Sequence, residues 1–247
     1  MARLLDDASS QWLSGTPTAN VTNPWSLSVW CYLDASVSAF AMGFTDGSDI
    51  HGLGIFESGG TLTPVIGYAR ATWSSATGAT STVSLNTWFN LVGVYDNTPN
   101  RTVYLNGGNK GSAAGSSITG TEYRCGAAEN RGSPAMEWSG RLALIAYWNT
   151  ALTDSDALAL GSGIHPRLIK PSSLVAIWPF GYPAPNHDND VWSSEDLTPQ
   201  NSPTWANSPS GLIVPGQSTY ARRLRVVRPK IGGGLACGRG RIGSLVG

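Results

Sequence analysis

The chain has 247 residues, a formal net charge of zero and a charged fraction of only 13%. Because globular domains carry about 25% charged residues, this composition excludes a long charged helix, a coiled coil and a highly charged disordered chain. Hydrophobic residues make up 41% of the chain, and thirty glycines and fifteen prolines favour turns over helices. We therefore expect a folded, β-rich protein with many loops.

The first clear strand is predicted at residues 25–33. Leu27, Val29, Cys31 and Leu33 alternate with serines and aromatic residues, and this period of two places them on one buried face. The same criteria predict further strands at residues 10–13, 38–44, 52–57, 63–68, 80–85, 88–95, 122–127, 140–148 and 174–178.

Two local motifs predict a hairpin and a helix. Asn-Gly-Gly at residues 106–108 follows a strand at residues 102–106 and supplies positive φ angles, so this strand should pair antiparallel with the segment that follows. A short helix is expected at residues 154–160, because Thr153 can cap its free amides while Asp156 returns the contact. It is the one convincing helix of the chain.

Four sequence blocks occur in an order that is typical of one fold family. They are residues 25–33, 87–96, 101–107 and 138–154, and the last contains Asn-x-Ala-Leu-Thr at the start of the predicted helix. Over about residues 8–214 the chain resembles the laminin G-like jelly roll of the concanavalin A-like lectin/glucanase superfamily. This resemblance implies an all-β fold, a two-sheet antiparallel β-sandwich with one short helix.

The glutamates argue against an enzyme of this type. Glucanases of the superfamily carry a Glu-x-Asp-x-x-Glu type pattern on one strand, because two carboxylates must flank the sugar bond from one face. None of the five glutamates has another glutamate four or five residues later: Glu57, Glu122, Glu129, Glu137 and Glu195. A Gly-x-Ser-x-Gly nucleophile motif is also absent. We therefore expect no catalytic residue.

Metal ligands are sparse in the sequence. The three histidines lack metal-ligand spacing and are expected at the surface or as caps: His51, His165 and His187. Asp188 and Asp190, with Glu195 and Asp196 nearby, offer oxygen ligands to calcium, as some laminin G-like domains do at loop ends. Their spacing fits no defined calcium loop, so a solvated acidic loop is the favoured interpretation. No other cofactor is expected.

Three tryptophans are candidates for stacking on sugar rings. Trp73, Trp192 and Trp205 lie outside the predicted strands, where an aromatic face can remain open to a ligand. Buried anchors for long loops, or contacts with a neighbouring subunit, are alternative interpretations of the same residues.

The zero net charge hides a basic C-terminal segment. Residues 1–196 contain all sixteen acidic residues, whereas residues 197–247 contain no acid and seven bases, Arg222, Arg223, Arg225, Arg228, Lys230, Arg239 and Arg241. We therefore divide the chain into a jelly-roll domain, residues 1–216, and an extended, basic, glycine-rich C-terminal arm, residues 217–247.

An extended arm on a compact sandwich is a means by which shell proteins lock to their neighbours. The chain resembles virion proteins of tailed bacteriophages, where such jelly rolls occur as capsid decoration, fibre or tail components. The leading hypothesis is a non-enzymatic structural protein of a bacteriophage virion, whose arm docks onto an acidic surface of the capsid or of a sister subunit. The alternative is a carbohydrate-binding, lectin-like module for adhesion to a host glycan.

Further expectations concern partners and location. Other virion proteins are the expected partners, together with further copies of this chain in a homo-oligomer. No secretion signal or membrane span is visible, and three widely spaced cysteines argue for assembly in the reducing host cytoplasm: Cys31, Cys125 and Cys237. Nucleic acid is not an expected partner, because the arm has no aromatic residue beyond Tyr220 for stacking on single strands.

Overall fold

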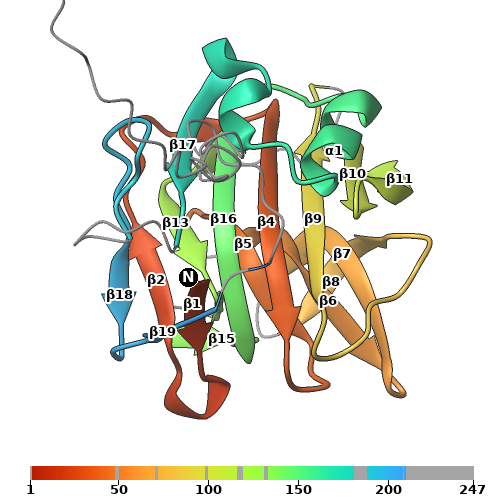
Figure 1. Cartoon of the computed structure of the whole chain (residues 1–247), viewed down its shortest axis with the longest axis vertical. Coiled ribbons are helices and arrows are strands. Elements are labelled where there is room, and N and C mark those ends of the chain that lie inside the picture. Colours follow the sequence, from red (N-terminus) through yellow and green to blue (C-terminus); the bar gives the residue numbers. More distant parts are fainter. Residues whose placement is uncertain are drawn as a thin grey trace, which may run out of the picture. The chain divides into compact units, whose positions relative to one another are not determined.

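The computed structural model describes residues 2–47, 50–69, 72–97, 100–115, 119–130, 133–180, 188–207 and 209. Two antiparallel sheets in this part of the chain pack face to face as a β-sandwich of the jelly-roll type (Figure 1). The described residues also form one α-helix, α1 (Asp154–Gly161), and three short 3-10 helices, η1 (Asp7–Ser9), η2 (Pro166–Leu168) and η3 (Pro171–Ser173). The all-β sandwich expected from the sequence is confirmed.

The first sheet has eight strands. Its order is β11 (Gly108–Ala114), β10 (Asn100–Leu105), β9 (Trp88–Tyr95), β4 (Trp25–Leu33), β16 (Gly140–Trp148), β1 (Ala2–Leu5) and β19 (Thr204–Ala206). The eighth strand, β17 (Leu174–Trp178), also pairs with β16, beyond the end of β1.

The second sheet has seven strands. Its order is β18 (Thr198–Gln200), β2 (Trp12–Gly15), β13 (Glu122–Cys125), β5 (Ala39–Thr45), β6 (Ile50–Ser58), β7 (Thr61–Ala69) and β8 (Trp73–Gly78). Two small ribbons pair β3 (Val21–Thr22) with β12 (Thr119–Gly120) and β14 (Ala128–Asn130) with β15 (Ser133–Ala135).

The main core lies between the two sheets. The four alternating residues of β4, from Leu27 to Leu33, are fully buried there, as the period of two predicts. Aromatic rings fill the space beside them: the Trp25 ring stacks on Tyr95 with 4.4 Å between centroids. Cys31 and Cys125 are buried free thiols, and burial raises the pKa of both well above the ordinary value. Both therefore act as small apolar residues of the core.

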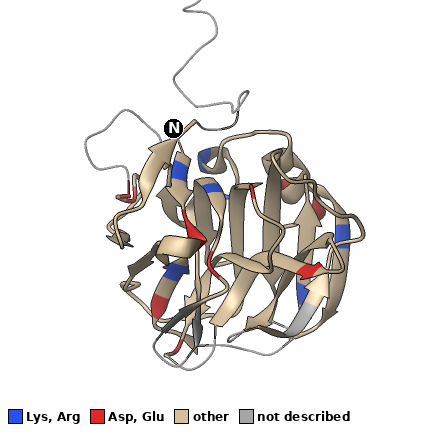
Figure 2. Cartoon of the chain, turned by 90° about the horizontal axis from the view of Figure 1, so that it is seen from below, with Lys and Arg blue, Asp and Glu red and all other residues tan. Residues whose placement is uncertain are grey.

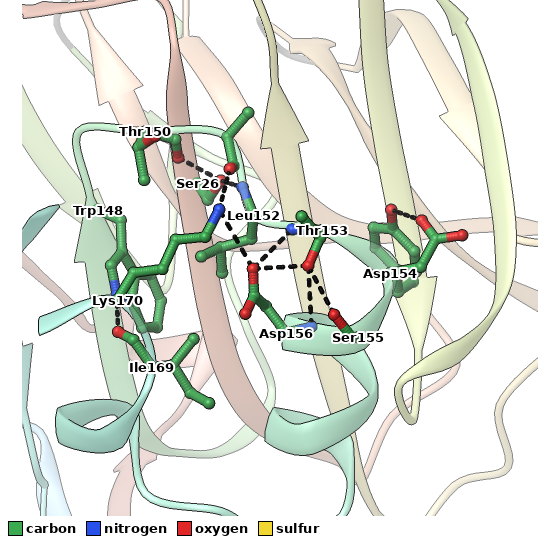
Figure 3. Close-up of polar contacts among 12 residues, drawn as sticks. Ser26, Trp148, Thr150, Leu152, Thr153, Asp154, Ser155, Asp156, Ile169 and Lys170 are labelled. Atoms are coloured by element: carbon green, nitrogen blue, oxygen red, sulfur yellow. Dashed lines mark hydrogen bonds and ion pairs between the residues drawn. The ribbon is translucent and has the colours of Figure 1, made fainter.

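Helix α1 packs on the outer face of the first sheet. The predicted capping box is confirmed: the Thr153 hydroxyl accepts from the Asp156 N–H, and the Asp156 carboxylate accepts from the Thr153 N–H. Lys170 ties this end of the helix to its flanking loops, since its Nζ lies 3.2 Å from the Asp156 carboxylate and donates to the Ala151 carbonyl at 2.8 Å (Figure 3). A second apolar cluster is buried beneath the helix.

The hairpin at residues 106–108 is confirmed, with positive φ at Asn106 and Gly107 between β10 and β11. Gly107 is also required by packing, because a Cβ there would lie 2.7 Å from the Leu158 Cα of α1. The strand predicted at residues 80–85 is wrong. Val83 and Leu85 alternate toward the core, but this segment crosses from one sheet to the other and forms no strand, although the Val83 N–H donates to the Leu62 carbonyl of β7 at 3.0 Å.

Charged side chains are thinly spread over the described surface. Figure 2 shows positions of both signs scattered along a ribbon that is mostly uncharged. None of the helices in the described part of the chain has the length and hydropathy that a bilayer crossing requires.

Candidate functional site

A polar cleft of about 330 Å³ opens where the two sheets meet beside β17. Its walls come from five separate segments: residues 18–24, strand β13, the end of β16 with Asn149, strand β17, and the loop that carries Glu195. This volume lies at the lower end of the roughly 300–1,000 Å³ of small-molecule sites. The space therefore suits a small polar ligand or the end of a longer one.

The floor of the cleft is formed by two tyrosines and a glutamate. Tyr123 is fully buried, Tyr147 is 5% exposed and Glu195 is 2% exposed. The two tyrosine rings lie 6.1 Å apart, centroid to centroid, in an edge-to-face arrangement. The Glu195 carboxylate accepts from the Thr18 N–H at 3.1 and 3.2 Å and from the Thr18 hydroxyl.

Both phenols stay protonated at neutral pH. Burial raises the pKa of Tyr123 and of Tyr147, and the negative charge of Glu195 raises both further. Among the described residues no hydrogen bond of normal geometry reaches the Tyr123 hydroxyl, although it lies close enough to the Glu195 carboxylate to interact with it. A buried hydroxyl without a partner is costly, so this O–H is a donor that a bound ligand can satisfy.

Three asparagines line the upper part of the cleft. Asn20 and Asn149 are exposed, and Asn23 is half-buried. The Asn23 amide donates to the Asp96 carbonyl at 3.0 Å, which leaves its buried Oδ1 without a partner in the described part of the chain. Amide groups combine a donor and an acceptor, the combination that matches a pair of vicinal hydroxyls.

Asp190 holds the loop that places Glu195. Its Oδ1 accepts from the N–H groups of Ile177 at 2.7 Å and Trp192 at 2.9 Å. Its Oδ2 accepts from the N–H groups of Ser193 at 2.7 Å and Glu195 at 3.4 Å, and also from the Ser193 hydroxyl. One carboxylate thus joins strand β17 to the turn at residues 191–195.

The calcium candidates have protein partners in the structure. Asp190 is buried within these bonds, Asp188 forms an ion pair with Arg3, and Asp196 accepts from the Asp190 N–H at 2.9 Å. Glu195 faces the cleft. Within the described ranges no group of three or more histidine, cysteine, aspartate or glutamate side chains is placed to hold a metal ion. The acidic loop is therefore not solvated as expected, since Asp190 and Glu195 are buried.

Two of the tryptophan candidates lie in strands, which corrects the sequence prediction. Trp73 begins β8, donates its indole N–H to the Ile55 carbonyl at 2.9 Å and packs 5.9 Å from the Phe40 ring. Trp205 lies in β19 beneath the Arg3 guanidinium, 3.9 Å from the ring centroid. Both strands are short and polar, so their sequences lack the alternation that predicts a strand.

Trp192 is the most exposed of the three tryptophans, at 38%. Its indole N–H donates to the Leu174 carbonyl of β17 at 2.9 Å. Trp73 lies in the second sheet, Trp205 in the first sheet, and Trp192 in the loop between β17 and β18. Stacking of a sugar on any of them stays a prediction.

The histidines differ in their roles. His165 is the expected cap, since its Nδ1 accepts from the Arg167 N–H at the start of η2. His51 is not at the surface but buried, 3.4 Å from the Tyr95 hydroxyl. The seven basic residues of the predicted arm, His187 and Cys237 lie outside the described residues.

The cleft was not apparent from the sequence. Tyr123 and Tyr147 lie in predicted strands, and nothing near them in the chain distinguishes them from core residues. The sequence suggests Glu195 only as an oxygen ligand near a calcium site. A signal exists in the Asp-x-x-Ser pattern at residues 190–193, which is typical of a carboxylate that caps its own turn.

A family model described as the concanavalin A-like lectin/glucanases superfamily matches residues 7–157, more than half of the chain. The chain belongs to this superfamily. The sandwich, with α1 packed on its first sheet, is thus a superfamily fold, and the match ends within α1, before β17 and the Glu195 loop.

Solved structures share this superfamily fold. A protein from Bacteroides ovatus, described as a candidate carbohydrate-binding protein, matches with a TM-score of 0.60 and 17% identity over 82% of this chain and 58% of that one. A heptameric SAP-like pentraxin from Limulus polyphemus matches with a TM-score of 0.53 and 14% identity over 78% and 87% of the two chains. The chain thus spans less than two thirds of the Bacteroides protein. No curated protein matches.

Proposed function

We propose that the protein is a non-catalytic, carbohydrate-binding, lectin-like module that holds a saccharide in the cleft between β13 and β17. The observation that carries this proposal is the lining of the cleft, where phenol and amide groups surround a buried carboxylate. Membership of a lectin and glucanase superfamily and the fold shared with the Bacteroides ovatus protein support it.

The chemistry of the lining suits a sugar. A saccharide hydroxyl both donates and accepts, so it can accept from Tyr123 or Tyr147 while it donates to Glu195. The asparagines offer paired donors and acceptors to further hydroxyls at the rim. A ligand that makes these bonds also satisfies the buried Tyr123 hydroxyl, which gains affinity without a large apolar contact.

The test is binding of the full chain to a glycan array, followed by calorimetric titration of any saccharide that binds. Asn20→Ala and Asn149→Ala remove exposed amides of the cleft and should each weaken binding by roughly 5–10-fold, the loss expected for one hydrogen bond. Asn97→Ala, at an exposed turn after β9, is the matched control and should bind as the unchanged protein does. Loss of affinity in the control alone, or in none of the variants, contradicts the location of the site.

A binding module should not consume its ligand. The same saccharide, incubated with the protein, should therefore be recovered intact, and release of new reducing ends would contradict the non-catalytic proposal.

The structural role in a phage virion stays a second proposal, motivated by the charge asymmetry of the sequence. The arm that would dock lies outside the described residues, so its contacts with other virion proteins or with copies of this chain are expectations. Deletion of residues 217–247 should abolish incorporation into particles while leaving saccharide binding unchanged. Undiminished incorporation would remove the docking role.

A further inference from the structure

The charge of the cleft sets it apart from a site for acidic sugars. Glu195 is 2% exposed, and its two oxygens accept from the backbone and hydroxyl of Thr18 and lie close to the Tyr123 hydroxyl. No lysine, arginine or histidine occurs among the described residues that line the cleft. The carboxylate therefore meets an incoming ligand without a cation to offset its charge.

The other polar groups of the floor do not reverse this bias. Tyr123 and Tyr147 are neutral donors, and the rim is built from neutral amides and threonines. Two phenol donors and one carboxylate acceptor match a hydroxyl of the ligand, and the carboxylate can also accept from a ligand ammonium group. A ligand carboxylate in the same position would meet the like charge of Glu195 in a partly buried space, where screening by water is weak.

From this arrangement we infer that the cleft selects neutral or amine-bearing saccharides and rejects saccharides whose bound end carries a carboxylate, with Glu195 as the selecting residue. This inference rests on the proposed carbohydrate-binding function and deepens it. Glu195 donates nothing, so a hydroxyl, amide or ammonium group of the ligand is needed to donate to it. Where that group is a hydroxyl, Tyr123 and Tyr147 fix its position by donating to its oxygen.

The experiment changes the ligand first, so that it does not depend on a variant that folds. Methyl glycosides of glucose, galactose and mannose are titrated with the full chain, together with the corresponding 2-amino sugar, uronic acid and uronamide. The uronamide has the shape of the uronic acid without its charge. In the sugar series that binds, we expect the neutral sugar and the amino sugar to bind at least as tightly as the uronamide. The uronic acid should bind at least roughly tenfold more weakly than the uronamide.

A protein variant then assigns the selection to Glu195. Glu195→Gln retains an oxygen that accepts from Thr18 and removes the charge, so the affinity ratio between uronamide and uronic acid should fall to about threefold or less. Near-ultraviolet circular dichroism checks that this variant is folded. If it is not, Tyr147→Phe serves as the second variant: it removes a neutral donor, so it should weaken all four ligands while the ratio stays unchanged.

The outcomes separate the two proposals. Equal or tighter binding of the uronic acid than of its uronamide overturns the charge selection and leaves carbohydrate binding intact. A ratio that Glu195→Gln does not change also overturns it. Absence of binding by every saccharide in the panel and on the array removes the proposed function and the selection together.

Discussion

Replacing Asp190 by asparagine tests whether this one carboxylate holds the Glu195 loop against β17. The substitution keeps the size of the side chain and changes one oxygen to an NH₂ group. The asparagine Oδ1 can still accept from the Ile177 and Trp192 N–H groups, as it does in the unchanged protein. The NH₂ group then faces the N–H groups of Ser193 and Glu195, which lose their acceptor.

The magnitude follows from those two lost bonds. A hydrogen bond to a charged group contributes about 1.5–3 kcal/mol. The bond from Ser193 is 2.7 Å long and counts fully, whereas the bond from Glu195 is 3.4 Å long and contributes less. The Ser193 hydroxyl can rotate to accept from the new NH₂ group, which limits the loss. We expect the free energy of unfolding to fall by about 2–4 kcal/mol.

Urea denaturation followed by tryptophan fluorescence measures the change, with Asp34→Asn as the matched control. Asp34 is exposed and accepts from the Ser139 hydroxyl at 2.9 Å, so its substitution should cost less than about 0.5 kcal/mol. Saccharide affinity of folded Asp190→Asn protein should also fall, since Glu195 loses a backbone anchor. A difference in free energy of unfolding below about 1 kcal/mol is no larger than a surface substitution produces. If Asp190→Asn differs from the unchanged protein by less than that, the carboxylate does not hold the loop as described.

Three further predictions concern pH, backbone packing and calcium. Burial, and to a smaller extent the Arg167 charge, lowers the pKa of His165 from 6.5 to about 4. Between these pH values the unfolded chain binds a proton at His165 that the folded protein does not bind. The free energy of unfolding should therefore fall by about 2–3 kcal/mol as the pH drops from 6.5 to 4. His165→Asn, which keeps an acceptor for the cap, should reduce this dependence in urea titrations; an identical pH profile would contradict the assignment. Gly52→Ala places a Cβ against the Met42 carbonyl oxygen, so it should lower the melting temperature sharply, at a cost of about 2 kcal/mol or more in stability. The Cβ of the control variant Gly108→Ala meets open space and should change the melting temperature little. Equal melting temperatures of the two variants would refute the packing argument. Millimolar calcium should not shift the melting temperature, because the acidic side chains already have protein donors; a rise with calcium would revive the metal site.

Local sequence signals predicted those elements whose determinants are neighbours in the chain. The buried face of β4 follows from alternation, the β10–β11 hairpin from Asn106 and Gly107, and helix α1 from Thr153 and Asp156. The sequence predicts neither β8 nor β19, because neither segment alternates apolar and polar residues. Each is a strand only through its hydrogen bonds to a neighbour, β7 for β8 and β1 for β19. Residues 80–85 show the converse, an alternation that faces the core without a partner strand.

The amino-acid sequence by itself determined the fold class, the superfamily, the short helix and the absence of a glucanase motif, because each depends on residue type and short-range spacing. Only the tertiary structure decided where the cleft lies. β13 inserts between β2 and β5, and β17 aligns beside β16, which brings Tyr123, Tyr147 and Glu195 together from segments far apart in the chain. A period of two states which face of a strand is buried, but it does not state which strand lies next to it.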